Sequence, residues 1–113
     1  MKYYHNPRCR KSREGLQYLE ELNIHPTIIE YLKNPLDKEE LKEILKQLKY
    51  SPIDLVRKNE VVYKKYIKNK NLPDEDILKW LLNEPKLIER PILSTDKGAK
   101  IGRPKENFKE ILP

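Results

Sequence analysis

Residues 1–22 read MKYYHNPRCRKSREGLQYLEEL and carry the pattern of a strand, a loop and a helix. Residues 1–5 are aromatic-rich and are interrupted by Asn6-Pro7, which predicts a strand that runs into a tight loop. Leucines then recur every three residues, so we expect a helix just after Cys9, with Ser12 able to cap it near its start. Residues 27–31, TIIEY, are β-branched and apolar and predict a buried strand. Strand, helix and strand form a βαβ unit.

The middle of the chain, at about residues 36–84, is expected to be a helical insertion. Asp37 caps a segment whose apolar side chains recur at i, i+3, i+4 and i+7, and Pro73-Asp74 starts another helix. Residues 96–98 suit a turn between two antiparallel strands, and a last helix follows Pro104. The order βαβ, helices, ββα predicts an α/β, thioredoxin-like fold with a mixed sheet, in one domain over residues 1–113.

Composition narrows the class of protein. The chain has 113 residues, no apolar run as long as the ~18 residues of a membrane span, and no apolar signal-peptide core at its start, so we expect a cytoplasmic protein. One cysteine and two histidines predict neither an internal disulfide nor a metal site. The net charge of +6 suits nucleic acid or a small anion, but the lysine-rich run at residues 64–70 is interpreted as a solvated helix face, which makes nucleic acid an improbable partner.

Cys9 is the main candidate for chemistry. Free N–H groups at a helix start and the basic neighbours at positions 8, 10, 11 and 13 lower the pKa of a cysteine. A free cysteine is more often a small buried hydrophobe, but one flanked by arginines is hard to bury. Ser12 stands where a dithiol reductase would carry its second cysteine, so Cys9 would form a mixed disulfide with a thiol of another molecule.

Six motifs in order resemble the glutaredoxin-coupled arsenate reductase (ArsC) family over the whole chain. They are Tyr4-His5-Asn6-Pro7, then Cys9, Ser12 and Arg13, residues 26–32, residues 55–59, Arg90-Pro91-Ile92 and Gly102-Arg103-Pro104. The resemblance implies the thioredoxin-like fold and the reduction of arsenate to arsenite. It also implies glutathione as co-substrate, glutaredoxin as protein partner, and no bound cofactor.

The resemblance also assigns residue roles. Cys9 would attack arsenate, while Arg57, Arg90 and Arg103 would hold the oxyanion and stabilise the thiolate. Guanidinium groups suit this task because they grip oxyanions bidentately and stay charged, although each arginine taken alone could be a solvated surface charge. Pro91 would be cis beside the cysteine, where an ordinary trans proline at a strand start is the alternative.

The remaining candidates support the loop around the cysteine. His5, Asn6, Ser12 and Arg13 belong to the matching motif, and His5 could hydrogen-bond the thiolate or simply end the strand. Arg10 and Lys11 occupy positions where the family often has small residues. Their charge should favour the thiolate, and it could narrow the pocket or shift selectivity toward another anion such as the glutathione carboxylates.

Two further functions stay open at this point. Spx-type redox-sensing regulators, which bind RNA polymerase, share an Arg-Pro-Ile segment but typically have a second cysteine and lack counterparts of Arg57 and of Gly-Arg-Pro. Ser12 and the three arginines therefore favour an enzyme. A thiol oxidoreductase of the same family with another substrate is the other alternative.

Overall fold

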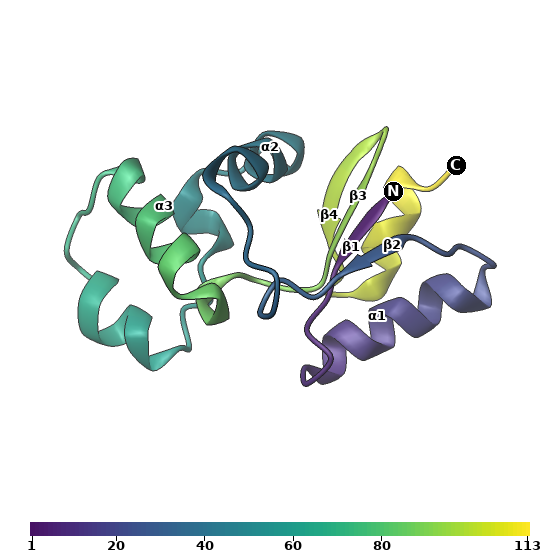
Figure 1. Cartoon of the computed structure of the whole chain (residues 1–113), viewed down its shortest axis with the longest axis horizontal. Helices are drawn as coiled ribbons and strands as arrows, with labels where there is room; N and C mark the ends of the chain where they lie inside the picture. Colours follow the sequence, from purple (N-terminus) through teal and green to yellow (C-terminus); the bar gives the residue numbers. More distant parts are fainter. The chain divides into compact units, whose positions relative to one another are not determined.

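A four-stranded mixed sheet is built from the two ends of the chain (Figure 1). The computed structural model describes all 113 residues, and its contacts group into two compact units, residues 1–34 with 90–113, and residues 35–89. The strands are β1 (Lys2–Tyr4), β2 (Thr27–Ile29), β3 (Ile92–Thr95) and β4 (Gly98–Ile101), in the order β2-β1-β3-β4. β1 pairs with β2 in parallel and with β3 antiparallel, and β3 pairs antiparallel with β4. The βαβ and ββ parts of the predicted thioredoxin-like layout are therefore confirmed.

One face of this sheet carries the core of the unit. Helix α1 (Arg10–Glu21) and the 3₁₀ helix η4 (Lys105–Ile111) lie on the same side of the strands (Figure 1). Tyr3 and Leu93 face each other in the β1–β3 register, and both are fully buried against Leu19, Phe108 and Ile111. The Tyr3 and Phe108 rings meet edge to face with their centroids 6.0 Å apart. Because η4 is 3₁₀, the helix predicted after Pro104 exists but is wound more tightly than an α-helix.

Two local predictions in this unit are wrong. Residues 27–31 were expected to form a buried strand, but β2 ends at Ile29 and lies at the sheet edge, where the Ile28 side chain is 46% exposed. β-branched residues favour a strand whether or not both of its faces are covered. The helix begins at Arg10, just after Cys9 as expected, but Cys9 is its N-cap residue, so Ser12 lies inside the first turn and does not cap the helix.

Residues 35–89 form a helical unit, and the insertion expected at about residues 36–84 falls within it. Its α-helices are α2 (Lys38–Leu48) and α3 (Asp74–Asn83). The short helices η1 (Pro52–Leu55) and η2 (Tyr63–Ile67) lie between them in the chain, and η3 (Pro85–Leu87) follows α3. The predicted cap is confirmed, since an Asp37 carboxylate oxygen accepts a 2.8 Å bond from the Glu40 N–H. The predicted apolar faces are buried, with Leu41, Ile44 and Leu45 on α2 and Ile77, Leu78 and Leu81 on α3. That the whole chain acts as one domain stays a prediction.

None of the helices combines the length and the apolar character that a membrane crossing requires.

Candidate active site

Cys9 lies where β1 has ended and α1 begins. Its backbone N–H donates to the Asn6 carbonyl at 3.0 Å, and its own carbonyl accepts from the Arg13 N–H at 3.1 Å. These two bonds close the loop onto the first helical turn. The side chain is partly exposed and sits at the helix N-terminus, where unpaired backbone N–H groups favour a negative charge.

Ser12 holds this loop in place from the inside. Its side chain is fully buried, and its hydroxyl accepts a 3.0 Å bond from the Asn6 N–H and shares a 2.7 Å bond with His5 Nδ1. The Ser12 carbonyl accepts a 2.6 Å bond from the Tyr3 hydroxyl. The hydroxyl thus connects the helix to the loop by hydrogen bonds, whereas the sequence pattern predicted that it would cap the helix.

The other candidates of this motif also brace the loop. The Asn6 side-chain oxygen accepts from the Arg8 N–H at 3.0 Å, and Arg13 Nη1 donates to the Pro7 carbonyl at 2.9 Å. His5 stacks on Tyr3 with ring centroids 5.6 Å apart, and its hydrogen bond goes to Ser12. Burial lowers the pKa of His5, outweighing the opposite effect of Glu30, so the imidazole is mainly neutral near pH 7.

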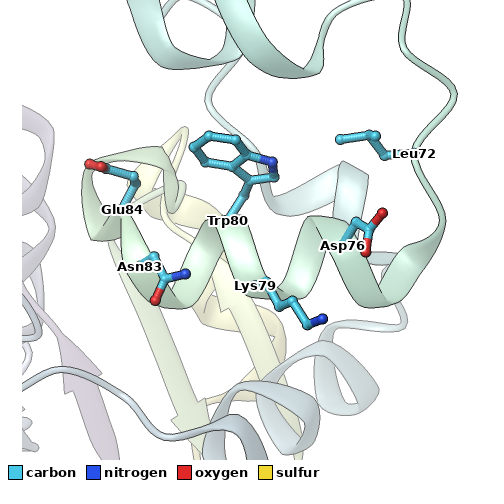
Figure 2. Close-up of a pocket in the computed structure, with 6 residues that line it drawn as sticks. All are labelled: Leu72, Asp76, Lys79, Trp80, Asn83 and Glu84. Atoms are coloured by element: carbon cyan, nitrogen blue, oxygen red, sulfur yellow. The ribbon is translucent and has the colours of Figure 1, made fainter.

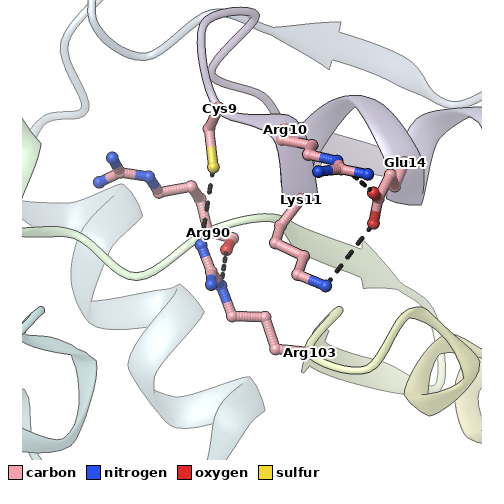
Figure 3. A network of polar contacts seen from close by, with 6 residues as sticks. All are labelled: Cys9, Arg10, Lys11, Glu14, Arg90 and Arg103. Atoms are coloured by element: carbon pink, nitrogen blue, oxygen red, sulfur yellow. Dashed lines mark hydrogen bonds and ion pairs between the residues drawn. The ribbon is translucent and has the colours of Figure 1, made fainter.

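Two of the three predicted arginines, Arg90 and Arg103, lie next to the cysteine, and Figure 3 shows the contact of Arg103 with its sulfur. Arg103 Nη2 donates to Cys9 Sγ at 3.6 Å, and Arg103 Nε donates to the Arg90 carbonyl at 2.8 Å. Arg90 is 8% exposed and precedes Pro91, which is buried and follows a cis peptide bond, as the resemblance implied. A second cis bond joins Arg103 to Pro104, and the Gly102 N–H donates to the Pro91 carbonyl at 2.9 Å. The two Arg-Pro segments therefore lie side by side next to the thiol.

The pKa of Cys9 is lowered from the ordinary value of a thiol. Partial burial raises it, but this is outweighed by the backbone N–H of Ser12, by the hydrogen bonding and charge of Arg90, and by the backbone N–H of Lys11. The sulfur does not close a capping hydrogen bond onto these amides, so they act as nearby partial positive charges. Together with the Arg103 contact, these groups stabilise a thiolate.

Arg10 and Lys11 are directed toward Glu14 (Figure 3). Arg10 Nε lies 3.0 Å from one Glu14 carboxylate oxygen, and Lys11 Nζ lies 3.7 Å from the other. Their side chains are 84% and 57% exposed. Glu14 therefore offsets part of the charge that was expected to act on the thiol, and sequence spacing alone could have found it, because Glu14 stands four residues after Arg10 on the helix.

Arg57 belongs to the 35–89 unit and is held there by carboxylates. Its Nη1 lies 3.6 Å from a Glu60 oxygen and its Nε lies 3.4 Å from a Glu89 oxygen. Its backbone N–H donates to the Leu87 carbonyl at 2.7 Å, next to the bridge between Val56 and Ile88. A role for Arg57 in oxyanion binding stays a prediction.

The 35–89 unit has a surface pocket of its own along α3 (Figure 2). It measures about 230 Å³, and Trp80 forms part of its wall while stacking on Tyr66 with ring centroids 5.3 Å apart. The residues that line the pocket include neither a cysteine nor a histidine. They are Leu72, Asp76, Lys79, Trp80, Asn83 and Glu84. Nowhere in the chain do three or more His, Cys, Asp or Glu side chains gather in a way that could hold a metal ion.

Known proteins resemble this chain over nearly its full length. The sequence pattern of the ArsC family matches residues 4–111. A Neisseria meningitidis protein named arsenate reductase is 39% identical, with 99% of this chain and 97% of the relative covered. The Escherichia coli protein YfgD, whose function is uncharacterised, is 40% identical, with 99% of this chain and 96% of the relative covered. A solved structure titled arsenate reductase from Vibrio cholerae is 40% identical, covers 99% of this chain and 98% of its own, and superposes with a TM-score of 0.92.

Proposed function

The chain belongs to the ArsC family, and on this premise we propose that it reduces arsenate to arsenite with Cys9 as its single nucleophilic thiol. The observation that carries the proposal is the position of the Cys9 sulfur, which lies at the N-terminus of α1 and 3.6 Å from the Arg103 guanidinium. A thiolate beside fixed positive charge is both activated for attack and placed where an oxyanion would be held.

In the proposed reaction the Cys9 thiolate attacks arsenic, and one arsenate oxygen is protonated by solvent and leaves as water, giving a Cys9 thiol–arsenate adduct. A glutathione thiolate then attacks the Cys9 sulfur. The sulfur–arsenic bond breaks, its electron pair stays on arsenic, and As(V) becomes As(III) as arsenite departs. The two sulfurs, each oxidised by one electron, form a mixed disulfide, which a glutaredoxin thiol clears by exchange.

The reductant must come from outside the chain in this scheme. Cys9 is the only cysteine, and the third position after it holds a buried hydroxyl. Glutathione and glutaredoxin are supplied in a reducing compartment, so we place the protein in the cytoplasm in this proposal. Arg90 and Arg103, with Arg57 as the third cation implied by the family resemblance, would bind the arsenate oxygens and stabilise the charge that develops on them.

NADPH consumption in a mixture of arsenate, glutathione, glutaredoxin and glutathione reductase tests this proposal. We expect arsenate-dependent turnover that is abolished in Cys9→Ser and lowered about 10²- to 10³-fold in Arg103→Ala, the loss typical of one charge-stabilising donor. Arg10→Gln is the matched control, since its guanidinium pairs with Glu14, and it should keep most of the activity.

Turnover that survives Cys9→Ser would contradict the mechanism. If a folded wild-type protein shows no arsenate-dependent turnover although its Cys9 still alkylates rapidly at neutral pH, the proposal of arsenate reduction is contradicted. Capture of RNA polymerase by such a protein would instead support the Spx-type alternative.

A further inference from the structure

A small pocket lies beside the Cys9 loop, wholly within the unit formed by residues 1–34 and 90–113. It measures about 110 Å³ and joins the first turns of α1 to the segment between β4 and η4. Its wall begins at Lys11, two residues after Cys9, and includes Gly102 and Pro104, which flank the arginine that contacts the sulfur. A molecule with one end in this pocket can therefore extend toward the thiol.

The pocket presents charges of both signs. Its charged lining residues are two lysines, Lys11 and Lys105, and two glutamates, Glu14 and Glu106. Lys11 Nζ lies 3.7 Å from a Glu14 oxygen, and Lys105 Nζ lies 5.9 Å from the centroid of the Tyr18 ring, so both ammonium groups have fixed neighbours. An inorganic oxyanion would be repelled by the two carboxylates. A group that carries a carboxylate and an ammonium on the same carbon matches both signs.

We propose that this pocket binds the γ-glutamyl end of glutathione and so directs the glutathione sulfur to Cys9. This inference rests on the proposed function for the choice of thiol. The γ-glutamyl end carries an α-carboxylate and an α-ammonium together, which Lys11 with Lys105 and Glu14 with Glu106 complement. The glycyl end carries a carboxylate only and offers no positive charge to the two glutamates.

The size of the pocket agrees with this orientation. Ligand sites that enclose a whole drug-sized molecule are roughly 300–1,000 Å³, so a space of 110 Å³ holds one end of a tripeptide. One residue of extended peptide spans about 3.5 Å, and the γ-linkage lengthens the glutamyl arm further. With its head between α1 and η4, glutathione would therefore reach back along the first turn of α1 to the sulfur.

Disulfide exchange tests the pocket without arsenate. The Cys9 thiolate attacks one sulfur of glutathione disulfide, a Cys9–glutathione disulfide forms, the original S–S bond breaks, and the second glutathione leaves as a thiolate. The rate is followed by intact-protein mass spectrometry and divided by the rate with neutral 2-hydroxyethyl disulfide. This ratio removes any change in the reactivity of Cys9 itself.

Two truncated disulfides identify the end that is bound. Bis-γ-glutamylcystine lacks glycine and should keep the preference over 2-hydroxyethyl disulfide, whereas cystinyl-bis-glycine lacks the γ-glutamyl groups and should lose it. Lys11→Gln and Lys105→Gln should each lower the ratio for glutathione disulfide about threefold, the effect of one solvent-exposed charge pair. Lys109→Gln, a charge-matched control on η4 outside the pocket, should leave the ratio unchanged.

The outcomes separate this inference from the proposed function. A preference that is unchanged in both pocket variants, one that follows the glycyl end, or a Cys9 that reacts with none of the disulfides would overturn the γ-glutamyl site. Arsenate turnover by a protein with such a result would leave the proposed function standing alone. Selective exchange in a protein that does not reduce arsenate would leave the γ-glutamyl site standing alone.

Discussion

Removing the guanidinium of Arg103 measures how much of the Cys9 thiolate's stability comes from this one contact. The Arg103 Nη2 and Cys9 Sγ atoms are 3.6 Å apart. Two unit charges at that distance interact by about 1.2 kcal/mol at the dielectric constant of water and by about 4.6 kcal/mol at an effective value of 20. Because Arg103 is exposed and Cys9 is partly exposed, screening by water places the effect near the lower figure. Arg103→Gln should therefore raise the pKa of Cys9 by about one unit.

The pH dependence of iodoacetamide alkylation provides the assay. Cys9 is the only cysteine, so the rate of alkylation reports this thiol alone, and its midpoint between about pH 5 and pH 10 gives the pKa. Arg10→Gln removes the same charge from a neighbouring position, but its side chain is 84% exposed and paired with Glu14. We expect a much smaller shift in that variant. An unchanged midpoint in Arg103→Gln, or an equal shift in both variants, would show that the Arg103 contact does not stabilise the thiolate.

Three further predictions concern the stability of the unit that carries the site. Ser12→Ala removes the buried hydroxyl that joins helix and loop, so His5 Nδ1 and the Asn6 N–H each lose a hydrogen bond. Urea denaturation should show that the free energy of unfolding falls by about 2–4 kcal/mol, while its dependence on urea concentration stays unchanged. Burial lowers the pKa of His5, so the stability that its neutral form contributes is fully present above the unfolded pKa and is lost as the pH falls through the lowered folded pKa. Urea denaturation at a series of pH values should show this loss of stability in His25→Gln, which keeps His5, and not in His5→Gln. Gly102→Ala should cost about 1–3 kcal/mol, since its Cβ would overlap the Phe108 ring, and a combined Phe108→Leu change should make the two costs less than additive.

The features that sequence predicted well are local ones. The strand, the Asn6-Pro7 break and the helix around Cys9 lie within one short stretch. The Asp37 cap and the turn between β3 and β4 each depend on a few neighbouring residues as well. In each case the residues that specify the conformation are the residues that adopt it. The thiol at a helix start could therefore be found without knowing what the rest of the chain does.

Features that depend on residues far apart in the chain could not be predicted from the sequence. Arg103 and Cys9 are 94 residues apart, and only the pairing of β1 with β3 and of β3 with β4 brings their loops together. The exposure of β2 follows from its place at the sheet edge, which the strand alone does not encode. The serine three residues after the cysteine suggested a surface cap, because nothing nearby indicates that His5 and Asn6 would fold back over it.

The division of the sheet between residues 1–34 and 90–113 has a consequence for the newly made protein. During synthesis β1 and the cysteine emerge before β3, β4 and η4, which follow only after the whole of the compact 35–89 unit. Until then Cys9 lacks the contribution of Arg90 and the contact with Arg103, and only the local groups at the start of α1 can lower the pKa of its thiol. The full acidity of the thiol thus requires the segment that carries Arg90 and Arg103, so the thiolate reaches its full stability only after β3 and β4 have joined the sheet.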